Sequence, residues 1–156
     1  MNRLAALPVL LLAACTPATQ SSDGAGAMPP PAPPPPAMAA PSILGDYTVA
    51  IAAADVPASA PAEMRDGLVG SWRIAFHGGN HFVVNYNGQD VVQGHYQLSG
   101  NQIMFGTGET GAYACNTPAT YNWARNGNQL TFTLVGADAC DGREIVLTSR
   151  PLTRAP

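Results

Sequence analysis

Large apolar side chains alternate with polar ones through residues 71–135, in short runs separated by turn residues, and this pattern leaves few folds open. Trp72, Ile74 and Phe76 fall on one face of an extended segment, with Arg73 opposite. A period of two with aromatic and β-branched residues is typical of strands buried on one face. Similar runs make eight predicted strands in all, the others covering residues 47–51, 81–86, 91–100, 101–105, 120–127, 129–136 and 143–149.

Tight turns separate several of these runs. Asn87-Gly88 and Asn126-Gly127 carry the strongest short hairpin signal, and Ser99-Gly100 is a further turn sequence. Strands joined this way form an antiparallel up-and-down meander, with one short helix predicted over 62–68, after the first strand. Closure into a barrel removes the unpaired edges of such a sheet. The sequence therefore predicts an all-β, eight-stranded barrel, with an open bent sheet or a two-sheet sandwich as the alternative.

The predicted domain, residues 43–156, is mildly acidic. Its length of about 114 residues suits a single core. It contains six Arg and no Lys against nine Asp and Glu, which gives a net charge of −3 with His neutral. Because no basic cluster is present, we expect no nucleic-acid partner.

The N-terminus has the pattern of an export signal followed by a cysteine. Arg3 precedes the apolar run Leu4–Leu12, which is shorter than the roughly 20 residues that span a bilayer. Leu12-Ala13-Ala14-Cys15 resembles the lipobox of bacterial lipoproteins. The resemblance implies that residues 1–14 are a signal peptide and that Cys15 is acylated on its sulfur and amino group. The alternative is an ordinary secretory signal, which leaves Cys15 with a free thiol.

Residues 15–42 are expected to be a disordered tether. Pro29–Pro36 are all proline except Ala32, and such a composition cannot bury enough apolar surface to offset its ordering entropy. Docking of a proline-binding module is the alternative role. We expect a lipid-anchored protein of the cell envelope, bound to the membrane through its acyl chains. Thr16, rather than an Asp, follows the cysteine, which favours the outer membrane on its periplasmic side.

Leu68-Val69-Gly70-Ser71-Trp72 resembles the Gly-x-Trp signature of lipocalins and their calycin relatives. The resemblance covers roughly residues 43–150 and implies a lipocalin-like barrel. It also implies that Trp72 closes one barrel end, with an Arg near the last strand packed over its ring. Arg150 and Arg143 are the candidates, and Arg150 is the one we pair with Trp72. The strands are shorter than in full-length lipocalins and no final helix is predicted, which argues for a small interior.

The same resemblance implies a small apolar or amphipathic ligand inside the barrel, with no cofactor. The inward aromatic residues are the candidate lining, and core packing is the alternative role for each of them; they are Phe76, Phe82, Tyr96, Phe105, Tyr121, Trp123 and Phe132.

Cys115 and Cys140 are predicted to form a disulfide. In an up-and-down meander the connections that carry them, after the fifth and seventh strands, emerge at the same end of the barrel. An oxidising envelope compartment permits the bridge. It would close about 25 residues and contribute roughly 3 kcal/mol. A topology that placed these connections at opposite ends would exclude it.

The remaining polar motifs indicate neither a metal site nor catalysis. His77 and His81 flank a tight hairpin, but His95 is expected on the outer face of its strand, so no metal site is predicted. The carboxylates of segment 138–144 lack the spacing of an EF-hand and are interpreted as solvated acids on a disulfide-pinned turn. Without a Gly-x-Ser-x-Gly motif, a Lys or a free Cys in the domain, we expect no enzyme.

Two alternatives to ligand binding remain from the sequence. In the first, the domain is a protein-interaction module of the envelope, such as an inhibitor of an exported protease, and it acts through the loop predicted over 106–119. The sequence does not identify the protein partner. Otherwise it is a structural lipoprotein with a filled barrel.

Overall fold

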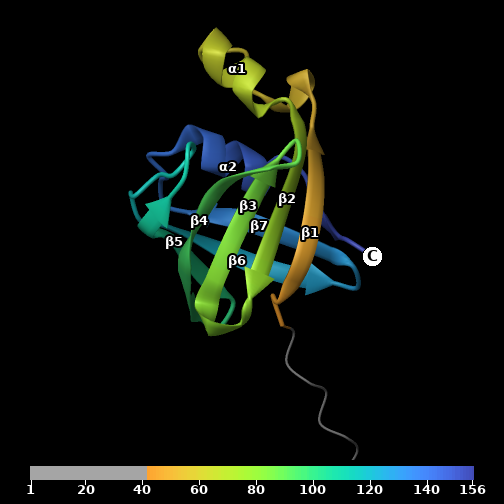
Figure 1. Ribbon diagram of the computed structural model, residues 1–156, viewed down its shortest axis with the longest axis vertical. Helices are drawn as coiled ribbons and strands as arrows, with labels where there is room; N and C mark the ends of the chain where they lie inside the picture. The colour runs from red at the N-terminus through yellow and green to blue at the C-terminus, as the bar shows by residue number, and fades with distance from the viewer. Residues whose placement is uncertain (1–41) are drawn as a thin grey trace, which may run out of the picture. The chain divides into compact units, whose positions relative to one another are not determined.

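The computed structural model describes residues 42–156, which form a closed antiparallel barrel (Figure 1). Each strand pairs with the next along the chain, and the last pairs with the first. The strands are β1 (Gly45–Ile51), β2 (Gly70–His77), β3 (His81–Tyr86), β4 (Gln89–Ser99), β5 (Gln102–Thr110), β6 (Ala119–Asn126), β7 (Gln129–Val135) and β8 (Leu152–Arg154). The predicted eight-stranded up-and-down barrel is confirmed, and the open sheet and the sandwich are excluded.

Two α-helices lie at one end of this barrel, and β1 begins at the other (Figure 1). The helix α1 (Ala62–Leu68) links β1 to β2 and has the predicted bounds. The helix α2 (Asp141–Thr148) links β7 to β8 and was not predicted. Two short 3₁₀ turns, Ala53–Asp55 and Gly78–Asn80, complete the regular elements of the described residues.

The prediction of a strand over 143–149 was wrong, and the structure has a second α-helix where a single short helix was predicted. Most of this segment belongs to α2, and the eighth strand is β8. Ile145, Val146 and Leu147 are all buried, and so short an apolar run fits a helix as well as a strand. The N–H groups of Arg143 and Glu144 bond to the Cys140 carbonyl and so begin a helix rather than a ladder.

The short strand β8 closes the barrel. It pairs with β1 through Tyr47 and Arg154, and with β7 through Leu130 and Leu152. The side chains of Leu130 and Leu152 are fully buried, so closure also buries apolar surface at this seam. The three residues of β8 therefore pair with both β1 and β7, which would otherwise be unpaired edge strands.

An aromatic cluster fills much of the barrel interior. The ring of Phe105 lies 5.2 Å from Phe82, 6.0 Å from Tyr121 and 6.3 Å from Phe76, measured between centroids. Phe132 lies 6.3 Å from both Phe76 and Tyr121. These spacings suit edge-to-face and tilted aromatic packing. The five rings come from β2, β3, β5, β6 and β7 and connect the sheet across its interior.

The strand β5 is longer than predicted, so the connection to β6 covers residues 111–118 rather than 106–119. Gly106 allows the chain to fold this way, because its φ is +92°. A Cβ atom at this position would overlap the backbone of Thr117. The Gly106 N–H also donates to Glu109 Oε1 over 2.9 Å.

We predict that Gly106→Ala lowers the free energy of unfolding by about 2 kcal/mol or more, through backbone strain and the overlap with Thr117. Urea denaturation measures the loss. Gly100→Ala is the matched control, since it has a φ of +59° but open space around the added Cβ. Gly78→Ala, with open space and no positive φ, should change little. A loss at Gly106 no larger than that at Gly100 would contradict the close approach.

Candidate ligand-binding cavity

A cavity of about 590 Å³ opens at the helix-bearing end of the barrel. It lies between α1, α2 and the inner faces of β2–β5, with the 111–118 connection along one side. Its polar lining is small, and most of the wall is aliphatic or aromatic. The apolar lining residues are Met64, Leu68, Trp72, Ile74, Phe82, Val84, Val92, Phe105, Tyr113, Val146 and Leu147.

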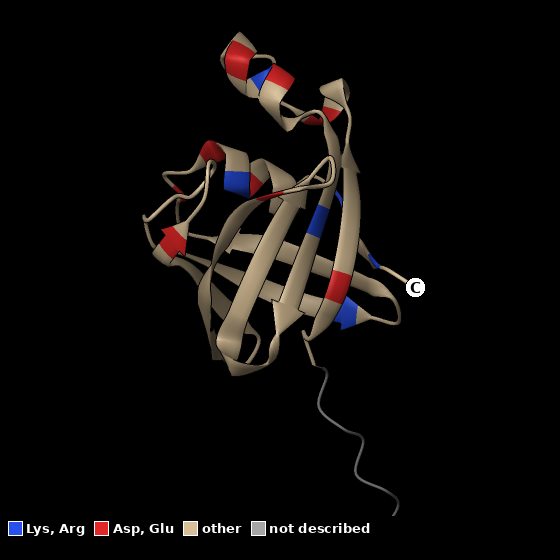
Figure 2. Cartoon of the chain, in the orientation of Figure 1, with Lys and Arg blue, Asp and Glu red and all other residues tan. Residues whose placement is uncertain are grey.

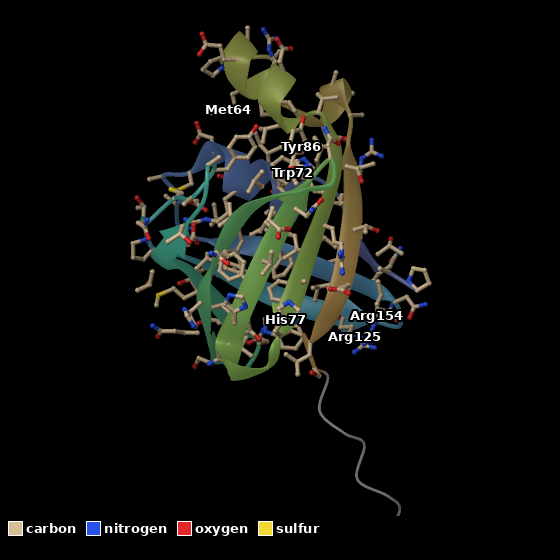
Figure 3. All side chains as sticks on the ribbon, in the orientation of Figure 1. Met64, Trp72, His77, Tyr86, Arg125 and Arg154 are labelled. Atoms are coloured by element: carbon tan, nitrogen blue, oxygen red, sulfur yellow. A yellow bond between two sulfur atoms is a disulfide. The ribbon has the colours of Figure 1, made fainter. Side chains whose placement is uncertain are left out.

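Trp72 joins α1 to this wall. Its indole N–H donates to the Leu68 carbonyl over 2.8 Å, at the end of α1. Its ring lies 4.6 Å from that of Tyr86 and 6.1 Å from that of Tyr113. Figure 3 shows Met64, Trp72 and Tyr86 gathered at the same end of the barrel. These contacts hold the indole as a fixed part of the cavity wall.

A buried ion cluster around Arg143 of α2 forms another part of the wall. The guanidinium bonds Asp138 through two nitrogens, each 2.7 Å from a carboxylate oxygen. A third nitrogen, Nη1, lies 3.3 Å from Glu109 Oε1. The side chains of Asp138 and Glu109 are 0% and 3% exposed. Charged hydrogen bonds of this kind are strong where water is excluded.

The same cluster organises the loop between β5 and β6. Glu109 accepts the Cys115 N–H through its second oxygen over 2.9 Å. Asn116 exchanges two hydrogen bonds with the Glu109 backbone, of 2.7 and 2.9 Å. Arg143 reaches the Thr117 carbonyl over 2.6 Å. One side of the cavity is therefore a loop fixed by charged groups rather than a mobile lid.

The predicted disulfide between Cys115 and Cys140 is present at this end of the barrel, with a Cα–Cα distance of 6.4 Å. The topology places the β5–β6 and β7–α2 connections together, as the meander requires. Both cysteines also line the cavity. The bridge joins the two segments that the ion cluster joins, so covalent and ionic contacts reinforce the same wall.

Protonation in the cluster follows from its hydrogen bonds. Burial disfavours the charged form of Asp138, but the donors Arg143, Tyr121 and Cys140 N–H outweigh it and hold its pKa below the ordinary value of 3.8. Burial, together with the adjoining Asp138 carboxylate, raises the pKa of Tyr121. The Tyr121 hydroxyl therefore stays protonated and donates to Asp138.

The predicted lining residues divide between the cavity and the core. Phe82 and Phe105 line the cavity, and both belong to the aromatic cluster, which therefore forms its inner wall. Phe76, Tyr121 and Phe132 pack within the cluster and do not line it. Tyr96 and Trp123 line a separate cavity of about 360 Å³, together with residues 42–44 and the β2–β3 connection.

The structure does not bring Arg150 onto the ring of Trp72. The ring-to-ring contacts recorded for Trp72 are with Tyr86 and Tyr113. The Arg150 guanidinium, half exposed, lies 2.9 Å from the Asp55 carboxylate. Arg143, the second candidate, belongs to the ion cluster of the cavity wall.

The three histidines form a row across neighbouring strands. His81 is in register with His77 on β2 and with His95 on β4, and His77 and His95 are exposed. Their ring centroids lie 5.9 and 5.5 Å from that of His81. Within residues 42–156, no group of three or more potential ligands is arranged to hold a metal ion.

The sequence interpretation missed the ion cluster. The acids of segment 138–144 were expected to be solvated, but Asp138 is buried because Arg143 and Tyr121 satisfy it. A signal was present, since Glu109 and Asp138 each lie a few residues before a disulfide cysteine in a chain with only 11% charged residues. Pairing the cysteines brings those two carboxylates together, although the cation between them cannot be chosen without the fold.

Cys15 and the predicted signal and tether lie outside the described residues. Within the described part of the chain, no helix is both long and apolar enough to cross a membrane.

Known proteins offer no guide to this site. No protein family, curated protein or solved structure matches the chain. The functional argument therefore depends on the cavity itself.

We predict that Asp138→Asn lowers the free energy of unfolding at pH 7 by about 3–5 kcal/mol, because it leaves Arg143 buried with one charged partner fewer. Urea denaturation measures the loss. Asp46→Asn is the control, since its ion pair with Arg73 is 2.8 Å long but exposed, and should cost under about 1 kcal/mol.

The Asp138 contribution should also depend on pH. Because its pKa is lower in the folded state, the stabilisation is present above the unfolded value of 3.8 and is lost as the pH falls through the folded value. The stability difference between wild type and Asp138→Asn should therefore narrow in acid. A difference independent of pH down to acid unfolding would contradict this assignment.

Proposed function

We propose that this protein binds a small apolar or amphipathic molecule in the helix-bearing end of its barrel, without catalysing a reaction. The observation that carries the proposal is the cavity of about 590 Å³. Its volume lies within the range of about 300–1,000 Å³ that is typical of small-molecule sites. A chain that folds only to be a filled barrel has no need of such a space.

The walls favour a ligand that is mainly apolar. Aromatic contact is available from Trp72, Phe82, Phe105 and Tyr113, and aliphatic contact from both helices. The wall is pre-organised, because a disulfide and the Arg143 cluster hold one side and the Trp72 indole holds another. Pre-organisation lowers the entropic cost of binding.

We also propose that the protein is a lipoprotein of the cell envelope, held through acyl chains on Cys15 and facing the periplasm from the outer membrane. The lipobox-like residues 12–15 and the short apolar run before them support this proposal. The disulfide agrees with an oxidising compartment. The domain would then offer its cavity to molecules of the envelope.

Ligand binding is tested by filling the cavity. We predict that the uncharged fluorophore N-phenyl-1-naphthylamine binds the full chain carrying Cys15→Ser, which lacks the acyl acceptor. Val84→Trp, which places a large side chain in the cavity, should weaken binding about tenfold or more. Val83→Trp is the matched control, because Val83 is the neighbouring residue of β3 and does not line the cavity.

Urea denaturation of both Val→Trp variants establishes that they are folded. Failure of the full chain carrying Cys15→Ser to bind the fluorophore, or equal binding by a folded Val84→Trp variant of it, would overturn the proposed site. Weakening by Val83→Trp as strong as that by Val84→Trp would also contradict it.

Acylation is tested separately, by the intact mass of the chain from membranes. We predict a mature chain that begins at Cys15 and carries acyl chains, and no acylation in Cys15→Ser. A mature chain released in soluble form, with an unmodified Cys15 thiol, would contradict the anchor.

A further inference from the structure

We infer that the ligand carries a cationic, amine-type polar group rather than a carboxylate or phosphate. This inference rests on the proposed function and concerns the same cavity. Four residues of its lining belong to charged types: the acids Glu63, Glu109 and Asp141, and the base Arg143. The charge of the ligand's polar group depends on which of these side chains the protein already pairs and which remain able to pair with a ligand.

Arg143 is the one basic residue of the cavity lining, and the protein itself occupies its donors. A guanidinium has five N–H groups. Arg143 donates five hydrogen bonds, two to Asp138, one to Glu109 and two to the carbonyls of Cys115 and Thr117. A ligand carboxylate would therefore have to displace an internal partner, leaving a buried carboxylate or carbonyl unpaired.

The buried cluster adds negative charge to this wall. The hydrogen bonds that Asp138 accepts hold its pKa below the ordinary value, and the single Arg143 guanidinium pairs with both Asp138 and Glu109. Glu109 lines the cavity directly. Because two carboxylates share one guanidinium, an incoming anion meets repulsion here, while an incoming cation is attracted.

The outer part of the cavity carries two more acids. Glu63 lies in the first turn of α1 and Asp141 in the first turn of α2, and both are exposed. Neither forms an ion pair within residues 42–156. Arg65, on the same helix as Glu63, donates instead to the Ala58 carbonyl over 3.5 Å. Figure 2 shows acidic residues on both helices at this end of the barrel.

The aromatic residues of the wall also favour a positively charged ligand group. Trp72, Phe82 and Phe105 line the cavity, and the face of an aromatic ring attracts a cation but not an anion. A primary amine on an aliphatic chain could therefore place its chain against these rings and its ammonium near Glu63 and Asp141.

The test compares three probes that share a ten-carbon chain: decylamine, decanol and decanoate, which are cationic, neutral and anionic at pH 7.5. Calorimetric titration of the full chain carrying Cys15→Ser, below the micelle concentration of the two charged probes and the solubility limit of decanol, gives their affinities. We expect decylamine to bind about tenfold more tightly than decanoate, with decanol between them.

The double variant Glu63→Gln/Asp141→Asn tests where the preference arises. We expect the ratio of decylamine to decanoate affinity to fall toward one. Asp66→Asn is the matched control, because Asp66 is an exposed acid of α1 that does not line the cavity, and it should leave the ratio nearly unchanged.

The outcomes separate the two proposals. Decanoate binding as tightly as decylamine would overturn the cationic assignment while the binding function stands. An unchanged ratio in the folded double variant would also overturn the role of these two acids. Binding of none of the three probes would overturn the proposed function and this inference with it.

Discussion

The pairing of Arg143 with Asp138 and Glu109 is the interaction on which the helix-bearing end of the barrel depends. Asp138 follows β7, Glu109 lies in β5, and Arg143 lies in the first turn of α2. A buried ion cluster does not by itself make a protein more stable, but removal of one member is costly because its partners stay buried and charged. The cluster therefore fixes the β7–α2 and β5–β6 connections, which the barrel ladder does not hold, against the end of β5.

Packed side chains fill part of the barrel interior, and a cavity occupies another part. Phe76, Phe105 and Phe132 fill the centre, as expected for strands of this number and length. At the helix-bearing end the interior is not filled, and α1, α2 and the β5–β6 connection form part of the cavity wall there. The cavity is therefore a consequence of how the helices and the β5–β6 connection are held, rather than of a wide barrel.

Much of this fold could be predicted from local pattern. Alternation identified the seven strands before α2, although β5 extends beyond its predicted end. At Asn87-Gly88 both residues have positive φ, +48° and +89°, as a type I′ hairpin turn requires. The disulfide followed from topology, because odd-numbered connections of a meander share one end. The errors fall at segment 143–149, where a short apolar run has no clear period, and at Asp138, whose partners Arg143 and Tyr121 lie 5 and 17 residues away and follow no period-two pattern.

By itself the sequence determined the class of fold, the order of the strands, the first helix and the pairing of Cys115 with Cys140, because these depend on residues close in the chain or on strand order. The tertiary structure alone decided that the chain after Cys140 is a helix, that β8 closes the barrel at Leu152–Arg154, and that a cavity exists. It also decided that the N–H groups of Arg143 donate to Asp138 and Glu109. The physical reason is that burial, and the meeting of Arg143 with Glu109 across 34 residues of sequence, depend on how separate segments pack, which no local period encodes.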